Sequence, residues 1–296
     1  MKIYNSDQNI DFRGSVVALG SFDGLHKAHM ELIKKTKEYG KDNNLASGVL
    51  LFDRLPAEVI SGSTKCIMTL EDKKELLSDL DFLYIQNFSK EFMSLVPEEF
   101  VRFLCEKLRI KAVCTGFNYR FGKNASGDVK KLLELGEKYG FSVLISDEYK
   151  IADKTVSSTL IRNFIENGDM DKAKEFLGRE FFLTGTVLGG YHLGRTLGFP
   201  TVNLGYDKNS IIPKFGVYHG SVDVNGENYK AVINVGIRPT FERSDVTIES
   251  FLLDFEGDLY DKKIRVNFSK YLRPEIKFEN AEKLTEQIQK DIKKIL

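Results

Sequence analysis

The stretch VALGSFDGLHKAH, residues Val17–His29, changes character in its middle. Its first residues close a short apolar run, Ser15–Ser21, of the kind that forms a buried strand. Glycines then mark a turn, and from Leu25 to Tyr39 the apolar residues take helical spacing. The stretch therefore predicts a strand that passes through a glycine turn directly into a helix.

The same alternation continues over the first ~150 residues. Strand-like runs are expected at 46–52, 82–85, 111–115 and 141–146, and helices at 71–80, 97–108, 128–139, 158–166 and 170–176. Strands that alternate with helices at this spacing favour a parallel sheet covered on both faces, as in Rossmann-like α/β proteins.

After residue 178 short alternating strands dominate. We expect them at 182–188, 216–224, 229–235, 247–254 and 264–271, with turn signals such as Asn225-Gly226 between them. This pattern predicts a compact antiparallel barrel, closed by an amphipathic helix over 279–296. We place the boundary near residues 178–182, which gives domains 1–180 and 181–296.

The bulk composition excludes several classes of protein. The 296 residues contain 43 Lys and Arg against 43 Asp and Glu, so no net basic field recruits nucleic acid or an anionic membrane. No apolar run reaches the ~18 residues of a membrane span, and the N-terminus lacks the apolar core of a signal peptide. Three scattered cysteines predict reduced thiols. We expect a cytoplasmic protein that is a monomer or a transient oligomer.

The first candidate site is the histidine pair. The sequence has four histidines, and His26 and His29 are three residues apart, a spacing that puts both imidazoles on one face of a helix. A helix N-terminus favours phosphate, and imidazoles there can stabilise charge on a leaving pyrophosphate. Histidines that only cap the helix are the alternative, and a metal pair ranks lowest because no third ligand has a recognisable spacing.

Placed after the turn Gly20–Gly24, the pair resembles the signature of HxGH-type nucleotidyltransferases, and most closely the FMN adenylyltransferase half of bacterial FAD synthetases. Two later stretches resemble the same family, GFNYRFGKNASGD at 116–128 and VSSTLIR at 156–162. From the residues alone, the serines of the second stretch could equally cap a helix, and Arg162 could be a surface charge. The resemblance implies catalytic His26, His29 and Arg162, flavin contacts from Asn118 and Arg120, and ATP contacts from Gly20, Phe22, Asp23, Ser157, Ser158 and Thr159.

The N-terminal half also departs from the family pattern. Ser21 stands where the family usually has Asn, Ala28 where it has Gly, Arg54 where it tends to have Pro, and Leu160 where it often has Arg. These departures motivate an alternative in which the protein is a riboflavin kinase whose N-terminal domain only binds nucleotide or flavin.

The second candidate site is the stretch GRTLGFPTVN, Gly194–Asn203, which follows the glycine turn Gly189-Gly190. Glycines let a backbone approach a phosphate closely, and Thr201 and Asn203 point the same way in an extended segment. Their oxygens are hard ligands suited to Mg²⁺. The stretch could be a plain loop between strands, but it closely resembles the ATP and Mg²⁺ loop of riboflavin kinases. The resemblance implies ATP contacts from Gly190, Gly194, Thr201 and Asn203, with Mg²⁺ held by the last two.

Further motifs of the C-terminal half resemble the same kinase family, including NVGIRPTF at 234–241, ESFLLDF at 249–255 and YLRPE at 271–275. A strand glutamate is ordinarily just a solvent-facing residue. The resemblance makes Glu249 the base that takes the proton from the flavin 5′-hydroxyl, and implies flavin contacts from Leu253 and Arg273.

Together the motifs predict a bifunctional riboflavin kinase/FAD synthetase. The barrel would make FMN from riboflavin and ATP, and the Rossmann-like domain would transfer AMP from a second ATP to FMN, giving FAD and pyrophosphate. The FMN phosphate itself attacks, so positioning and charge stabilisation carry this step. A non-catalytic flavin- or nucleotide-sensing regulator that binds nucleic acid is a second alternative, which the neutral charge disfavours.

Overall fold

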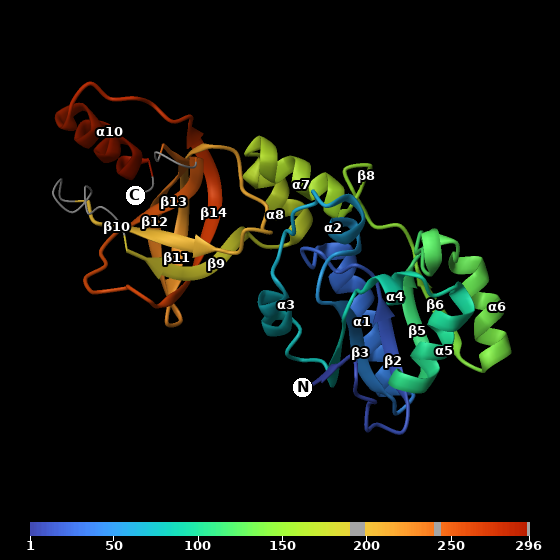
Figure 1. The fold of residues 1–296 in the computed structure, drawn as a ribbon. Coiled ribbons are helices and arrows are strands. Elements are labelled where there is room, and N and C mark those ends of the chain that lie inside the picture. Colours follow the sequence, from blue (N-terminus) through green and yellow to red (C-terminus); the bar gives the residue numbers. More distant parts are fainter. Residues whose placement is uncertain (190–198, 240–243, 295–296) are drawn as a thin grey trace. The chain divides into compact units, whose positions relative to one another are not determined.

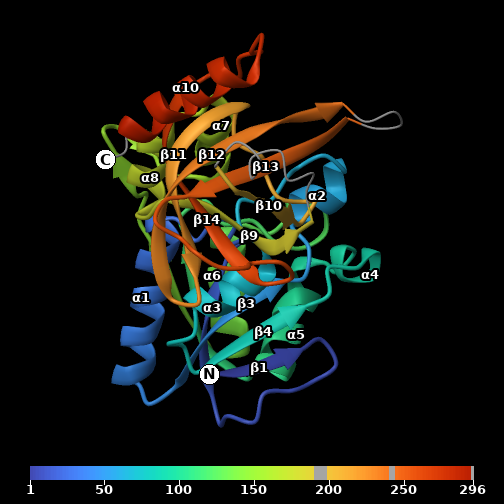
Figure 2. The same cartoon turned by 90° about the vertical axis from the view of Figure 1, so that its left-hand side faces the viewer.

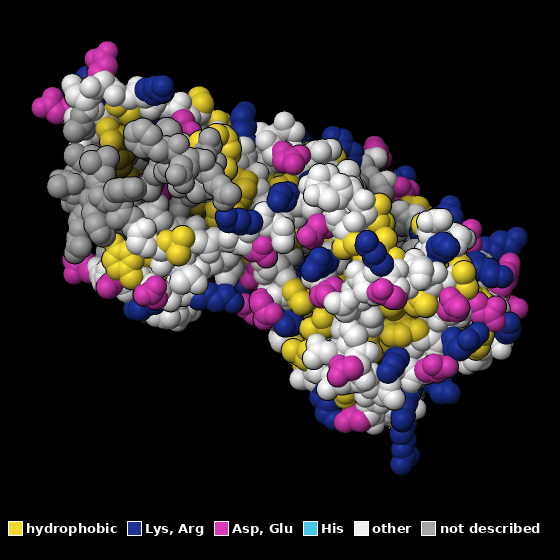
Figure 3. All heavy atoms as spheres, in the orientation of Figure 1, with side chains coloured by type: hydrophobic (Ala, Val, Ile, Leu, Met, Phe, Trp, Pro, Cys, Tyr) yellow, Lys and Arg dark blue, Asp and Glu magenta, His cyan; other side chains and the backbone are white. Residues whose placement is uncertain are grey.

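The computed structural model describes residues 1–189, 199–239 and 244–294. The chain separates into two compact units, Met1–Ser158 and Thr159–Leu296 (Figure 1). Within the described residues, no helix has both the length and the apolar character needed to cross a membrane. On the face drawn in Figure 3, basic and acidic side chains are interspersed.

The first unit is built on a six-stranded parallel sheet, in the order β1-β4-β3-β2-β5-β6. Its strands are β1 (Lys2–Asn5), β2 (Ser15–Leu19), β3 (Ala46–Phe52), β4 (Phe82–Gln86), β5 (Ile110–Gly116) and β6 (Ser142–Ser146). Figure 2 shows β1 at the edge beside β4. Every residue of the central strand β2 is buried, as expected for a parallel sheet covered on both sides.

Helices cover both faces of this sheet, as predicted. Leu104 of α5 (Pro97–Leu108) and Leu132 of α6 (Val129–Tyr139) share one core with Val17 and Val113. The opposite face carries α1 (Lys27–Asp42), where Gly40 lies so close to Val16 that a Cβ at this glycine would be 3.1 Å from it. Because strand residues alternate between faces, Val16 and Val17 belong to the two separate layers.

The strand order creates a switch point beside β2. From β2 the chain builds outward through β3 and β4, whereas β5 and β6 lie on the other side of β2. The loops after β2 and β5 therefore leave the carboxyl edge in opposite directions, and this is where open parallel sheets bind their ligands.

The predicted elements of this unit are present, with small shifts at their ends. The helix expected from Leu25 begins at Lys27, and the strand at 46–52 and the helix at 97–108 have the predicted bounds. Sequence reasoning missed several short elements: β1, β7 (Lys150–Ile151), β8 (Lys154–Thr155), α2 (Pro56–Ser61) and α4 (Lys90–Met93). The remaining helix, α3, spans Leu70–Leu76, and a single 3-10 turn spans Lys123–Ala125.

The second unit begins with α7 (Ser158–Asn167) and α8 (Met170–Leu177) and continues into a closed barrel in the order β10-β13-β12-β11-β14-β9. The barrel strands are β9 (Phe181–Leu188), β10 (Thr201–Tyr206), β11 (Gly216–Val224), β12 (Glu227–Pro239), β13 (Ser244–Leu252) and β14 (Lys263–Arg273). All their pairings are antiparallel. The predicted antiparallel barrel is thus confirmed.

The barrel is followed by the helix α10 (Ala281–Lys293), with Asn280 as its N-cap. The helix is shorter at both ends than the predicted 279–296. Residues 295–296 lie outside the described part of the chain.

Candidate active sites

The turn after β2 is tightly folded and almost entirely buried. Phe22 and Leu25 both adopt positive φ angles, 48° and 42°, although they are bulky residues. Gly24 between them has φ 78°, and a Cβ there would meet Ile67 at 3.0 Å. Such a conformation persists only where the surrounding structure enforces it, so this turn is a built feature of the fold.

Asp23 connects this turn to two distant segments. Its carboxylate Oδ1 accepts a hydrogen bond from the backbone N–H of Ile67 at 3.0 Å, and only 1% of the residue is exposed. The Asp23 carbonyl oxygen accepts a second bond, from the Ser158 hydroxyl at 2.9 Å. These two hydrogen bonds hold the turn against distant segments, and the expected contact of Asp23 with ATP stays a prediction.

The two histidines lie together at the start of α1. Their rings stack with centroids 3.5 Å apart and planes 12° from parallel. His26, which is 4% exposed, is the N-cap of α1, and its Nδ1 accepts the backbone N–H of His29 at 3.3 Å. In the neutral imidazole the proton is then on Nε2.

The expectation that both histidines lie within the helix is therefore wrong in one respect: His26 precedes the first helical residue. An N-cap has extended φ and ψ, and this conformation lets the ring fold back over His29. Capping and a phosphate-facing role are compatible here, because a capped helix start retains N–H groups that favour anions.

The Gly116–Arg120 loop lies at the same edge of the sheet. Thr115 pairs with Leu19 across β5 and β2, so the two loops leave neighbouring strand ends. A backbone bond from Tyr119 to the Gly116 carbonyl at 3.2 Å closes a turn, and Asn118 and Arg120 are exposed on it. The structure thus brings the predicted flavin residues to the strand end beside the histidine turn.

The stretch VSSTLIR forms the start of α7. Ser157 and Ser158 are half-buried and Thr159 is exposed. Arg162 follows Ser158 by four residues, so the two share a face of α7. Ser157 and Ser158 are the last residues of the first unit, and Thr159 and Arg162 belong to the second.

The barrel carries the second group of predicted residues on one outward face. Glu249 of β13 pairs with Asn203 of β10 on one side and with Asn234 of β12 on the other. Thr201 is opposite Phe251 in the same register, so its side chain is on the face of Glu249. Ile248 and Ser250, the neighbours of Glu249 along the strand, are buried and belong to the opposite face, inside the barrel.

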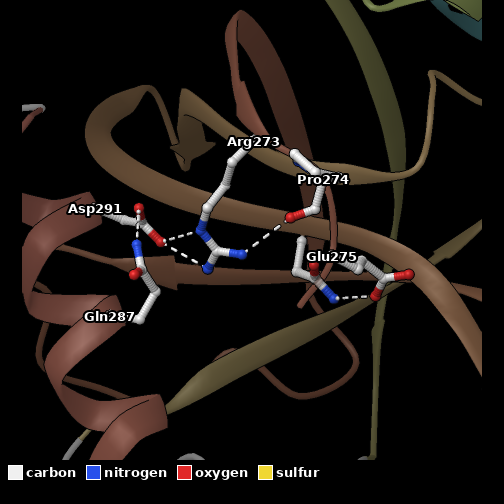
Figure 4. A network of polar contacts seen from close by, with 6 residues as sticks. Arg273, Pro274, Glu275, Gln287 and Asp291 are labelled. Carbon is white, nitrogen blue, oxygen red and sulfur yellow. Dashed lines mark hydrogen bonds and ion pairs between the residues drawn. The ribbon is translucent and has the colours of Figure 1, made fainter. Parts of the chain in front are cut away.

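The other predicted kinase residues are engaged within the protein or lie outside the described residues. Leu253 is buried, and its N–H donates to the Lys230 carbonyl. The Arg273 guanidinium binds the Asp291 carboxylate, at 2.9 Å from Nε and 2.7 Å from Nη2 (Figure 4). Gly190 and Gly194 lie outside the described residues.

Sequence reasoning did not single out Asn234, Gly236 or Glu275 individually, although it quoted the motifs that contain them. The Asn234 amide Nδ2 donates to Glu275 Oε1 at 3.3 Å. A Cβ on Gly236 would be 2.0 Å from the same oxygen, so the carboxylate occupies space that a side chain at this position would need. The glycine inside the motif was the available signal.

A parallel sheet with a histidine pair at its switch point, followed by a closed barrel that presents Thr, Asn and Glu on one face, fits a transferase that uses nucleotides in both domains. Family models agree: the FAD synthetase model matches residues 8–160, and the riboflavin kinase model matches residues 177–296.

Comparison with curated proteins finds relatives over nearly the whole chain. The bifunctional riboflavin kinase/FMN adenylyltransferase of Listeria monocytogenes is 36% identical over 282 residues, covering 93% of this chain and 90% of that protein. The Bacillus subtilis protein of the same name is 35% identical, covering 94% of this chain and 90% of its own length. A solved structure described as a macrolide-efflux protein from Streptococcus pneumoniae has 27% identity and a TM-score of 0.89, covering 100% of this chain and 99% of that one.

The chain belongs to the family of bifunctional riboflavin kinase/FMN adenylyltransferases. It phosphorylates riboflavin to FMN with ATP, and it adenylylates FMN to FAD. The kinase-only and sensor alternatives are not favoured, because both domains are present and the relatives carry both activities.

Proposed function

We propose that the two reactions are divided between the two candidate sites, with residues 1–180 performing adenylyl transfer and residues 181–296 performing phosphorylation. The observation that carries this proposal is the pairing of Glu249 with Asn203 in one site and the stacking of His26 on His29 in the other. Each set lies where its fold offers side chains to a ligand.

In adenylyl transfer, the FMN phosphate attacks the α-phosphorus of ATP, and pyrophosphate leaves. His26 and His29 donate hydrogen bonds to the phosphates as negative charge grows on the leaving group. The free N–H groups at the N-terminus of α1 carry a positive partial charge, which also stabilises the negative charge on the phosphates. Gly20 and Phe22 shape this turn, Ser157, Ser158 and Thr159 contact phosphate oxygens, and Arg162 offsets transition-state charge. Asn118 and Arg120, on the loop after β5, contact the flavin.

In phosphorylation, the riboflavin 5′-hydroxyl attacks the γ-phosphorus of ATP, and ADP leaves. Glu249 accepts the hydroxyl proton, and strand alternation directs its side chain to the outer face of the barrel, between its register partners Asn203 and Asn234. Gly190 and Gly194 complete the ATP loop. Leu253 contacts the flavin, and Arg273 lies on the flavin side.

Thr201 and Asn203 fit a magnesium site, because a hydroxyl and an amide oxygen on one strand face are hard ligands of the kind Mg²⁺ prefers. The ion would neutralise charge on the ATP phosphates. We also propose a cytoplasmic location and a monomeric or transiently oligomeric state, with small molecules rather than nucleic acid or membrane as partners.

The test separates the two reactions in one protein. Glu249→Gln and His29→Ala are incubated with ATP and Mg²⁺, and with either riboflavin or FMN, and the products are separated by chromatography. Glu249→Gln is expected to convert FMN to FAD but not riboflavin to FMN, and His29→Ala the reverse. Loss of both products, or of neither, in both variants contradicts the division.

A further inference from the structure

We propose that Asp291, on the terminal helix α10, is a positioning residue for the kinase reaction. It fixes Arg273, and through the segment that follows β14 it orients Asn234 beside Glu249. The inference rests on the proposed role of Glu249 as base.

The first link is the ion pair between Arg273 and Asp291. Both Nε and Nη2 of Arg273 donate to Oδ2 of Asp291, while Gln287 Nε2 donates to Oδ1 at 3.0 Å. The Asp291 side chain is 1% exposed and that of Arg273 14%. A charged, hydrogen-bonded pair this well buried holds its geometry, because separating it leaves a buried charge without compensation. Figure 4 shows that Arg273 points to α10.

The second link is the close fit of the segment from Tyr271 to Glu275 against the barrel. Arg273 pairs with Val217, and a Cβ on Gly216 would lie 2.5 Å from the Arg273 carbonyl oxygen. The Tyr271 hydroxyl donates to the Phe215 carbonyl at 3.3 Å. The Arg273 Nη1 also donates to the Pro274 carbonyl at 3.1 Å. A shift of Arg273 is therefore transmitted to the residues on either side of it.

The third link joins this segment to the proposed base. Glu275 Oε1 accepts from Asn234 Nδ2, and the same oxygen would be 2.0 Å from a Cβ on Gly236. Asn234 in turn is the register partner of Glu249. Glu275 therefore sets the orientation of the amide that neighbours the proposed base, and Asp291 sets Glu275 through Arg273.

This path gives Arg273 a different task from direct flavin contact, and a double-mutant cycle distinguishes the two. The full-length variants are Asp291→Asn, Arg273→Gln and the two combined. Lys283→Gln, which removes an exposed ion pair with Glu286 on the same helix, is the matched control. If Arg273 acts through Asp291, each single variant costs as much as the double variant.

The readouts are the kinase kcat, the riboflavin KM, the Tm and FAD formation from FMN. We expect Asp291→Asn to lower the kinase kcat by about tenfold or more, since small displacements of a reacting group are costly. The riboflavin KM stays near its parent value. FAD formation is unchanged because it belongs to the other domain, and a Tm near that of the parent shows that the barrel is folded. Asp291→Glu, which keeps the charge, restores part of kcat.

An unchanged kcat in Asp291→Asn overturns the proposal. So does a higher riboflavin KM in Arg273→Gln, if the losses of kcat/KM in the two single variants add up in the double variant. If Asp291→Asn does not fold, Glu275→Ala, which removes the acceptor of the Asn234 amide, tests the same path from its exposed end: a matching loss of kcat supports it, and an unchanged kcat overturns it. If Glu249 is not the base, Glu249→Gln retains kinase activity, and this result is distinct from the outcomes that test Asp291.

Discussion

Asn203 of β10 lies directly opposite Glu249 of β13 in the register of the barrel. Residues paired across antiparallel strands present their side chains on the same face at short range. The pairing therefore joins a residue from the predicted ATP loop to the predicted base, although 45 intervening positions separate them in the sequence. The proposed kinase site therefore depends on strand register rather than on proximity along the chain.

Replacing the oxygen ligands of the metal should change the Mg²⁺ requirement of the kinase. Thr201→Val keeps the shape of the side chain but removes its hydroxyl, so more Mg²⁺ is needed for half-maximal FMN formation. Thr201→Ser keeps the hydroxyl and serves as the control. The rate is measured against MgCl₂ concentration, and chelation of the metal should stop FMN formation. An identical Mg²⁺ dependence in Thr201→Val and the parent speaks against this ligand.

The two tasks of His26 can be separated by substitution. Asparagine is a strong N-cap, so His26→Asn should keep the start of α1 while losing the imidazole. His26→Ala should lose both, at a cost of about 1 kcal/mol in stability. We expect FAD formation to fall by about a hundredfold or more in both variants, with a lower Tm only in His26→Ala. Full activity in His26→Asn would show that His26 serves as a cap alone.

Substitution of Gly24 is expected to lower the stability of the protein more than substitution of Gly62, a glycine with a similar backbone conformation. Gly24 and Gly62 have φ angles of 78° and 70°, but a Cβ at Gly24 meets Ile67 at 3.0 Å, whereas nothing lies within 4 Å at Gly62. Gly62→Ala therefore has only the backbone cost, about 1 kcal/mol, and Gly24→Ala adds displacement of Ile67. Thermal unfolding compares them, and equal Tm changes are incompatible with a contribution from Ile67.

Tyr84 should contribute to sensitivity at alkaline pH. Burial raises the pKa of Tyr84 from its ordinary value of 10.0 to about 12, and its hydroxyl donates to the carbonyls of Ser6 and Gln8. The unfolded chain loses this proton near pH 10 and the folded chain holds it until about pH 12, so the contribution is full below pH 10 and falls as the pH rises through 12.

Urea unfolding at pH 8 and pH 11 measures this effect. The parent protein should lose more unfolding free energy between the two pH values than Tyr84→Phe does, because phenylalanine has no proton to release. Equal losses in the two proteins would mean that Tyr84 does not set the alkaline response.

Much of the fold follows directly from local patterns. The helix at 97–108 begins at a proline and has apolar residues at helical spacing, so its bounds are those predicted. The strand at 46–52 is an apolar run with buried neighbours on both sides. The short strand β1 was missed because four residues at a sheet edge, only one of them buried, carry too little pattern.

The sequence alone determined the order of the elements, the change from alternating strands and helices to an antiparallel barrel, and the residue types at both sites, because propensity and periodicity act over a few residues. Only the tertiary structure decided that His26 caps α1 while stacking on His29, that Glu249 lies between two asparagines, and that Arg273 binds Asp291. These relationships depend on register and on packing between distant segments, and no local pattern encodes which partner a side chain meets after the chain has folded.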